Sequence, residues 1–350
     1  MEREGLACCG RRILRFSLRR QAVLGLGLRA MEATRRAVID VGTNSIKLLV
    51  ADVAGHEVRP LLEESKQTRL GRGFYETHRL QPEAIAATAK AVAKFAETAR
   101  DQQAASIRVI ATSAARDALN AEQLTAAIAQ AAGLEVEIIS GEQEADWVFR
   151  GVTGNGALAQ EALLLLDVGG GSTEFIYGQG GRKHFGQSFP LGTLRVMEKF
   201  PPGDPPKSDE MAACRQWVAA FLRTEVVPML EPVLRRGENA ELKLVGTGGT
   251  ASILGRMEAQ LDDYDRARIE AVRLSLERVR WHTQRLWGLP LEERKEIVGL
   301  PKNRADVILP GVMIYETVMH LFGFTELRIS TRGLRFAAVM EGPAAVAPAR

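Results

Sequence analysis

The chain has 350 residues, of which 46% are hydrophobic and 25% charged, a composition typical of a globular protein with two sizeable cores. No apolar run approaches the roughly 18 residues that cross a membrane. Its three cysteines, two of them adjacent (Cys8 and Cys9), exclude a disulfide framework and favour a reducing, cytoplasmic location.

The positive charge is concentrated at the amino-terminal end. Residues 1–30 carry seven arginines and two glutamates, a net +5, so the remaining chain is −2 in a protein of net charge +3. Specific binding of nucleic acid is therefore not expected. We expect residues 1–34 to form a separate basic extension. It is a surface-binding arm, a targeting segment, a disordered tail, or sequence upstream of a start at Met31, which we favour.

In chain order, the first half predicts three strands and then an alternation of helices and strands. Strands are expected at 37–41, 46–53, 58–62, 107–111 and 134–139, and helices at 82–99, 117–132 and 140–152. Pro82 in a first turn and Gly133 after a last turn are typical helix boundaries. Residues 154–156 read as a linker.

The second half repeats this plan. Strands are expected at 163–167, 174–177, 183–188, 242–245 and 327–330. Helices are expected at 193–200, 208–234, 246–254, 275–286, 291–298, 304–321 and 333–340, before a tail at 342–350. The pattern predicts an α/β fold with domains at 35–157 and 158–341, whose last strand and helix are free to pack back on the first domain.

One stretch, LLLLDVGGGSTEFIYG at 163–178, indicates a phosphate site. Its leucines suit a buried strand, and three successive glycines let the backbone turn tightly and expose N–H groups to an anion. Asp167 and Glu174 flank the turn and would repel a bare phosphate, so the pattern favours a cation such as Mg²⁺ between carboxylate and phosphate. A tight hairpin with chance acids is the alternative, although it needs fewer glycines.

The same pattern occurs at 40–45, where Asp, Val, Gly and Ser recur 127 residues before their counterparts at 167–172. Both copies follow an apolar strand and continue into a second strand. This single duplication predicts two similar domains that face one shared phosphate cleft.

Residues 37–340 resemble the Ppx/GppA family of exopolyphosphatases and guanosine pentaphosphate phosphohydrolases, within the actin, Hsp70 and sugar-kinase superfamily. The resemblance is carried, in chain order, by AVIDVGTNSIKLLVADV, ATSAARDALN, EIISGEQEA, LLLDVGGGSTEF, LVGTGGTAS, RADVILPG and STRGLR. Thr43, in place of a commoner serine, and Gln143 are its small departures. It implies two actin-like (ribonuclease H-like) domains around an interdomain cleft, without the C-terminal HD domain of longer members.

The resemblance implies that Glu144 is the catalytic base, because a carboxylate can orient a water molecule and accept its proton. A helix N-terminal charge favoured by the helix dipole is the alternative, which we keep for Glu142. The resemblance further implies that Asp167 and Glu174 hold the metal.

Several groups are expected to hold phosphate. Those at the two turns are Asp40, Thr43, Asn44, Gly169, Gly170, Gly171 and Ser172. Gly246, Gly248 and Gly249 open a helix whose N-terminus favours phosphate, although simple strand–helix packing is the alternative. Arg116 and Arg304 are expected to follow the rest of a polyanion, with Arg69, Lys47 and Arg195 as further candidates.

Together these patterns predict a cytoplasmic, Mg²⁺-dependent exopolyphosphatase that removes terminal phosphate from polyphosphate and forms a homodimer. Guanosine pentaphosphate is the alternative substrate. An ATP-dependent kinase and a sensor that binds polyphosphate or guanosine tetraphosphate without cleaving it are the rival functions. No specific nucleic acid or membrane partner is expected, and no Cys/His spacing indicates zinc.

Overall fold

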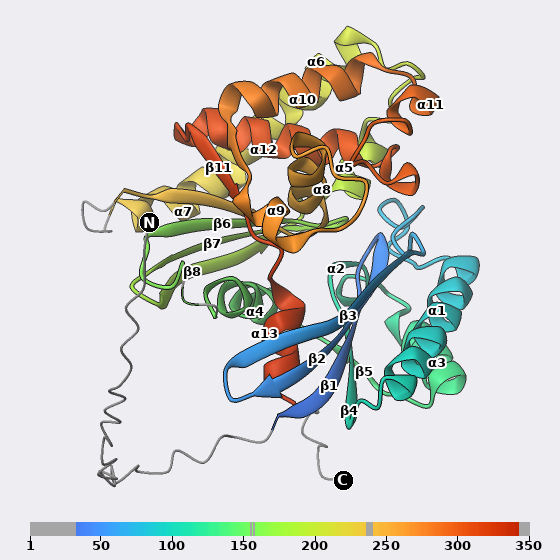
Figure 1. Ribbon diagram of the computed structural model, residues 1–350. Coiled ribbons are helices and arrows are strands. Elements are labelled where there is room, and N and C mark those ends of the chain that lie inside the picture. The colour runs from blue at the N-terminus through green and yellow to red at the C-terminus, as the bar shows by residue number, and fades with distance from the viewer. Residues whose placement is uncertain (1–32, 155, 157, 236–240, 343–350) are drawn as a thin grey trace, which may run out of the picture. The chain divides into compact units, whose positions relative to one another are not determined.

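Two mixed β-sheets organise the chain in the computed structural model, which describes residues 33–154, 156, 158–235 and 241–342 (Figure 1). The expected basic extension, except residues 33 and 34, and the expected tail, except residue 342, lie outside these residues. Within the described part, no helix is both long and apolar enough to cross a membrane.

The first sheet has the strand order β3-β2-β1-β4-β5. β1 pairs antiparallel with β2 and parallel with β4, as expected for a hairpin beside a parallel sheet. Its elements are β1 (Thr34–Val41), β2 (Ser45–Ala54), β3 (Glu57–Gln67), α1 (Pro82–Asp101), β4 (Ser106–Ala111), α2 (Ser113–Arg116), α3 (Ala121–Ala132), β5 (Val136–Ile138) and α4 (Gly141–Thr153).

The second sheet has the order β10-β11-β9-β6-β7-β8, and β6 is again antiparallel to the next strand and parallel to β9. Its strands are β6 (Leu163–Val168), β7 (Thr173–Gln179), β8 (Arg182–Phe189), β9 (Lys243–Thr247), β10 (Arg273–Ser275) and β11 (Glu326–Ile329). Its helices are α5 (Thr193–Lys199), α6 (Ser208–Phe221), α7 (Val227–Leu234), α8 (Gly248–Glu258), α9 (Arg266–Ala271), α10 (Leu276–Gly288), α11 (Leu291–Arg294), α12 (Ile308–Phe322) and α13 (Leu334–Met340).

Some predicted boundaries are wrong. The helix expected at 117–132 begins only at residue 121, as α3, because the side chain of Asn120 before it bonds both the N–H and the C=O of Leu80; the short helix α2 at 113–116 was not predicted. The helix expected at 304–321 begins at residue 308, after a 3₁₀ turn at Lys302–Arg304, and α11 stops at residue 294. α9 and β10 were not predicted. The helix expected at 208–234 contains a π-helical turn, Leu222–Val226, between α6 and α7.

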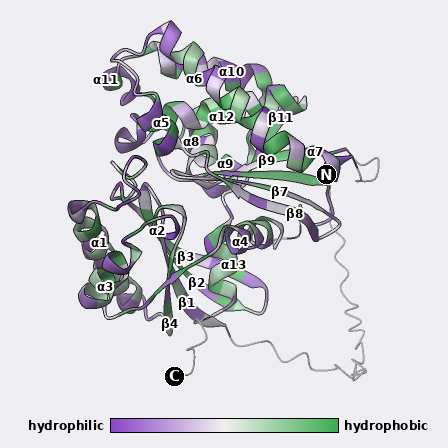
Figure 2. Cartoon of the chain, turned by 180° about the vertical axis from the view of Figure 1, so that it is seen from behind, coloured by the Kyte–Doolittle hydropathy of each residue, from purple (hydrophilic) through white to green (hydrophobic). Residues whose placement is uncertain are grey.

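The run of four leucines in β6 is explained by burial on both faces of its sheet. Leu164 and Leu166 contribute to a core with α8, α10 and α12, whereas Leu163 and Leu165 point into a second core. The outer helices α1 and α3 cover the opposite face of the first sheet and carry both apolar and polar colours in Figure 2, as surface helices do.

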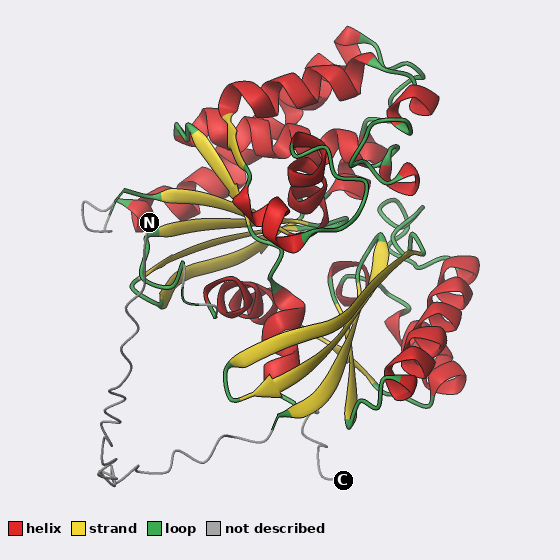
Figure 3. Ribbon diagram, in the orientation of Figure 1, coloured by secondary structure: helices red, strands yellow, loops and turns green. Residues whose placement is uncertain are grey.

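Helices α4 and α13 lie between the two sheets (Figure 3). α4 follows the first sheet in sequence but packs on β7 and β8, whereas α13 follows the second sheet and packs on β1 and β2. The core between them draws apolar residues from both sheets. This exchange of helices brings the carboxyl ends of β1 and β6 into one structural unit, residues 33–342.

We predict that Gly151→Ala destabilises the protein by about 1–3 kcal/mol. A Cβ atom at this position in α4 would overlap the Gly333 carbonyl oxygen, a backbone atom that no rotamer change can move. Urea unfolding measures the loss. Gly288→Ala, which meets open space near the end of α10, is the matched control and should gain up to about 1 kcal/mol from helix propensity. Equal effects of the two substitutions would contradict the close contact between α4 and the segment that begins α13.

Candidate functional site

A pocket of about 480 Å³ is lined by both predicted turns, by the first turns of α4 and α8, and by residues 301–304. Six carboxylates line it. Glu63 and Glu64 belong to β3, and the other four come two from each half of the chain: Asp40, Glu144, Asp167 and Glu174. Asp40 and Asp167 end the duplicated strands β1 and β6, where the carboxyl edge of a sheet commonly carries ligand-binding groups. We call this space the carboxylate pocket.

The two turns contact each other directly. A Cβ atom on Gly170 would lie 3.1 Å from Thr43 Cβ, and one on Gly171 would lie 2.8 Å from Thr43 Oγ1 and 2.6 Å from Ser113 Oγ. The glycines are therefore required for this close approach, in addition to the backbone freedom for which the sequence singled them out.

The backbone N–H groups of the turns divide into two kinds. Gly169 N–H donates to the Ser172 carbonyl at 2.9 Å, which makes it unavailable to a ligand and corrects the expectation that it binds phosphate. Within the described part of the chain, the amides of Gly170 and Gly171 have no hydrogen-bond acceptor, and neither have those of Thr43 and Asn44. Four donors are thus left at the contact between the turns.

Asp167 and Glu174, the expected metal ligands, lie opposite each other in the β6–β7 pair. Glu174 is 1% exposed, and its Oε1 accepts hydrogen bonds from the hydroxyls of Ser172 (2.9 Å) and Ser188 (2.7 Å). Ser172 therefore orients a carboxylate, whereas it was expected to bind phosphate. Asp40 Oδ1 is buried without a donor.

These oxygen atoms fit a magnesium ion. Among the described residues, no three His, Cys, Asp or Glu side chains are grouped so as to enclose a metal. Mg²⁺ usually takes one or two carboxylates and completes its shell with water and phosphate oxygens, so a pair such as Asp167 and Glu174 suffices. The unpartnered Asp40 oxygen adds an acceptor suited to a cation or a bound water and is unsuited to direct contact with phosphate.

Glu144 lies in the first turn of α4, which begins where the Ser140 hydroxyl accepts a hydrogen bond from Gln143 N–H at 3.1 Å. Its side chain is buried, and Arg116 Nη1 donates to Glu144 Oε2 at 2.9 Å. Arg116 also donates to the Ile139 carbonyl at 3.2 Å. Arg116 forms an ion pair with Glu144 and is not among the residues that line the carboxylate pocket, and its contact with phosphate stays a prediction.

Burial dominates the electrostatics of the four carboxyls that lie outside β3. It raises the pKa of Glu144 to about 7, with Arg116 opposing and the charges of Asp167 and Asp40 adding to the shift. The pKa of Glu174 is raised further above its ordinary value, by burial and then by Glu144 and Asp167. Neighbouring carboxylates add to the raised pKa values of Glu144, Asp167 and Glu174, because like charges in a poorly solvated space repel.

Lys47 and Arg304 supply positive charge to the pocket. Lys47 is the register partner of Asp40, at the position that Glu174 holds in the second copy, and burial lowers its pKa. Arg304 Nη1 donates to Ser45 Oγ at 2.8 Å, and burial lowers the pKa of Arg304 to about 10. Arg69 and Arg195 do not line this pocket.

The glycines around α8 differ in their surroundings. Gly248, with φ +78°, begins the helix, and a Cβ atom there would overlap the Asp167 carboxylate. Gly249 lies beside Arg304 Nη2. Gly246 is instead part of β9, where a Cβ atom would lie 2.9 Å from the Tyr315 ring. Gly246 therefore follows the strand-packing alternative, and the expectation that it binds phosphate is corrected.

Sequence reasoning missed several residues of the pocket. They are Thr112, Ser113, Thr247, Arg256, Tyr264 and Arg335. Ser113 and Arg335 fall in two of the segments that carry the family resemblance, ATSAARDALN and STRGLR, which was the available signal. Tyr264 lies just before the unpredicted helix α9, so no local pattern marked it.

A sequence model of the Ppx/GppA phosphatase family matches residues 49–341. Exopolyphosphatase 2 of Mycobacterium tuberculosis is 36% identical over 299 residues, which cover 82% of this chain and 90% of that protein. Exopolyphosphatase 1 of Mycobacterium bovis is 27% identical, with 87% of each chain covered.

Two solved structures are similar over most of both chains. The Aquifex aeolicus member of the Ppx/GppA family has a TM-score of 0.71 and 27% identity, covering 88% of this chain and 97% of its own. An exopolyphosphatase from Cytophaga hutchinsonii has a TM-score of 0.77 and 26% identity, covering 87% and 96%. The two-sheet arrangement is therefore the actin-like fold that the sequence predicted.

We predict that Glu144→Gln gains stability relative to the wild type as pH rises from about 4.5 to 7. The folded-state pKa of Glu144 lies above its unfolded value of 4.5, so in this window the folded state binds more protons and stability falls with increasing pH. The largest slope for one such group is about 1.4 kcal/mol per pH unit.

Urea unfolding of both proteins at a series of pH values measures the difference. Loss of the Arg116 contact shifts the unfolding free energy of the variant by a constant amount. The titration of Glu144 is reported only by how the difference between the two proteins changes with pH. Glu142→Gln removes an exposed carboxylate from the same helix turn and is the matched control. A pH-independent difference for Glu144→Gln would show that this carboxyl titrates normally in the folded protein.

Proposed function

Because the chain belongs to the Ppx/GppA phosphatase family, we propose that it is an exopolyphosphatase that hydrolyses the terminal phosphoanhydride bond of inorganic polyphosphate in the carboxylate pocket. The observation that carries the proposal is the position of Glu144, a buried carboxylate that lines the same pocket as both glycine turns. The names of the Mycobacterium relatives favour polyphosphate as the substrate.

The terminal phosphate is held between the two turns. The unpartnered amides of Gly170 and Gly171 donate to it from one turn, and those of Thr43 and Asn44 from the other. Lys47 and Arg304 offset its charge within the pocket, as does the N-terminus of α8. Such fixed donors stabilise charge that develops in the transition state without reorganising.

Glu144 orients the attacking water and accepts one of its protons. As the water oxygen bonds to the terminal phosphorus, the bond from that phosphorus to the bridging oxygen breaks, and the shortened chain leaves with the bridging oxygen. A base with a pKa near 7 is suited to this transfer at neutral pH. Arg116 holds the carboxylate in place from behind and acts as a positioning residue.

Asp167 and Glu174 would hold a Mg²⁺ ion, with Asp40 able to accept from its water shell. The ion neutralises phosphate charge. The serine hydroxyls on Glu174 fix the orientation of that ligand, as hydrogen bonds around metal ligands commonly do.

Guanosine pentaphosphate is the second candidate substrate. It presents the same terminal phosphoanhydride, and the pocket extends to Tyr264, whose half-exposed ring offers a surface for a base. The expected homodimer and cytoplasmic location stay predictions. Among the rival functions, the presence of Glu144, Asp167 and Glu174 in one pocket argues against a sensor without turnover, and the family membership argues against a kinase.

We predict that Glu144→Gln lowers phosphate release from polyphosphate by about 10²–10⁴-fold, the usual contribution of a general base. Phosphate release by the full chain with Mg²⁺ is measured on polyphosphate and guanosine pentaphosphate side by side, and the ratio of rates identifies the substrate. Glu142→Gln, on the exposed side of the same helix turn, should keep wild-type turnover. Normal turnover by Glu144→Gln would contradict the role of Glu144 as the base. A wild type that binds either substrate but releases no phosphate would favour the sensor.

We predict that Asp167→Asn raises the Mg²⁺ concentration needed for half-maximal activity at least about tenfold, a loss of about 1.4 kcal/mol in metal binding. Direct binding of Mn²⁺, followed by electron paramagnetic resonance, gives a readout independent of turnover. Asp52→Asn removes a carboxylate that pairs with Arg35 outside the pocket and is the matched control. Unchanged Mn²⁺ affinity in Asp167→Asn would exclude Asp167 as a metal ligand.

A further inference from the structure

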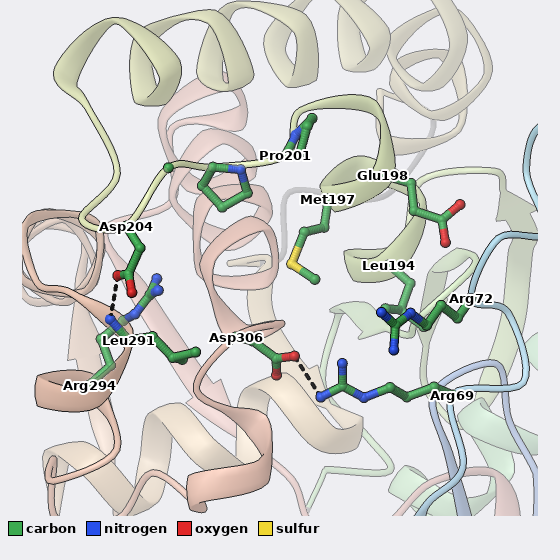
Figure 4. A pocket seen from close by; sticks show the side chains of 12 residues that line it. Arg69, Arg72, Leu194, Met197, Glu198, Pro201, Asp204, Leu291, Arg294 and Asp306 are labelled. Carbon is green, nitrogen blue, oxygen red and sulfur yellow. Dashed lines mark hydrogen bonds and ion pairs between the residues drawn. The ribbon is translucent and has the colours of Figure 1, made fainter.

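A second pocket, of about 320 Å³, lies where the loop after β3 meets α5, α11 and the residue before α12 (Figure 4). We call it the arginine pocket. Its charged residues are Arg69, Arg72, Arg294, Glu198, Asp204 and Asp306. The function proposed above uses none of them.

Arg294 is the unusual member of this set. Its side chain is 3% exposed, and within the described part of the chain its Nε and Nη1 atoms have no hydrogen-bond acceptor. Burial lowers its pKa, and the charges of Asp204 and Asp306 only oppose this shift. A buried guanidinium that lacks acceptors costs free energy, so its retention calls for an acceptor supplied from outside the chain.

The carboxylates of the pocket already have donors. Asp306 Oδ2 pairs with Arg69 at 2.6 Å, Asp204 Oδ1 accepts from Leu291 N–H at 2.6 Å, and Glu198 Oε1 accepts from Gly73 N–H at 2.7 Å. The first two of these contacts are drawn in Figure 4. The three arginines and three acids of the pocket cancel in formal charge. The acids each have a donor, whereas the Arg294 guanidinium still lacks hydrogen-bond acceptors within the described part of the chain.

Arg72 adds further guanidinium donors to the arginine pocket. Its side chain is exposed, lines the same pocket and forms no ion pair with any described residue. Within the described part of the chain, neither Arg72 nor Arg294 forms an ion pair with a carboxylate, and both guanidinium groups border this one pocket. Guanidinium groups bind phosphate oxygens through paired N–H donors. Asp306 Oδ1, which is buried without a donor, can accept from the P–OH of a hydrogen phosphate.

The arginine pocket adjoins the carboxylate pocket. Asn303 and Arg304 line the carboxylate pocket, whereas Asp306, two residues further on, lines the arginine pocket. On the other side, Arg69 N–H donates to the Asn44 carbonyl of the first turn at 2.9 Å. The segment 303–306 and the loop that carries Arg69 therefore separate the two spaces, and the Arg69–Asp306 ion pair lies at that boundary.

We propose that the arginine pocket is a second phosphate-binding site, in which Arg72 and Arg294 bind a phosphoryl group. This group is either a distal unit of the polyphosphate chain, an assignment that rests on the proposed function, or the phosphate of a separate ligand. Both sources present the same oxyanion to the two arginines.

Binding of inorganic phosphate to the full-length protein, measured by calorimetry without Mg²⁺, tests the site independently of catalysis. The wild type should bind one phosphate, in the arginine pocket, because the acids of the carboxylate pocket repel bare phosphate without Mg²⁺; Arg72→Met and Arg294→Met should bind none. Arg223→Met, which removes an exposed arginine outside both pockets, is the control and should bind one. Arg72 is exposed, so its variant folds even if Arg294→Met does not.

Kinetics with chains of different length separate the two sources. If a distal unit occupies the site, KM for long polyphosphate rises about tenfold in Arg72→Met, whereas KM for triphosphate stays unchanged. If a separate ligand occupies it, KM is unchanged at every length while the phosphate stoichiometry still falls. Unchanged stoichiometry and unchanged KM in both variants would overturn the proposal and leave a hydrated ion-pair cluster.

The outcome is distinguishable from failure of the proposed function. A wild type that releases no phosphate, but loses one bound phosphate in Arg72→Met, would retain the arginine pocket and reject the exopolyphosphatase. If the wild type releases phosphate and both variants bind as many phosphates as the wild type, the exopolyphosphatase is retained and the arginine pocket is rejected as a phosphate site.

Discussion

The structure depends on the contact between two turns, one of which, at Gly169–Gly171, carries no side chains. Gly170 and Gly171 lie against Thr43 and Ser113, and a Cβ atom at Gly192 would overlap the Gly170 carbonyl oxygen. Because the backbones are this close, the amides of both turns can reach one ligand. A single added methyl group at either glycine would separate the two halves at the point where the phosphate is proposed to bind.

The carboxylate pocket combines this contact between the turns with several carboxylates whose burial in the folded protein costs free energy. Four buried acids face Lys47 and Arg304, and burial raises the pKa of each acid while it lowers that of each base. Such opposed shifts commonly mark sites where charge is arranged for chemistry at the expense of stability.

The exchange of α4 and α13 between the sheets explains how one chain holds both halves in register. α4 places Glu144 at its first turn while its apolar face packs on the second sheet. α13 returns to the first sheet, where Arg335 donates to the Leu48 carbonyl and pairs with Glu63. The base and the turns are thus positioned by helices whose packing partners lie far away in sequence, which makes the site sensitive to substitutions such as those at Gly151.

The sequence alone determined the alternating elements, the duplicated strand–turn–strand units and the acids at their ends. These features follow from local periodicity, glycine content and the chemistry of phosphate, which neighbouring residues suffice to specify. Asp167 and Glu174 were predicted to act together because they flank one glycine turn. The family resemblance, not periodicity, singled out Glu144.

Only the tertiary structure decided which arginines meet which anions. Arg116 pairs with Glu144 and Arg69 pairs with Asp306, whereas Nε and Nη1 of the buried Arg294, which the sequence did not single out, have no acceptor within the described part of the chain. Gly169 and Ser172 use their donors within the turn itself, which no composition could reveal. The physical reason is that the partner of a long, flexible arginine side chain depends on which carboxylates the fold brings near it and on how deeply it is buried. Both depend on contacts between residues remote in sequence.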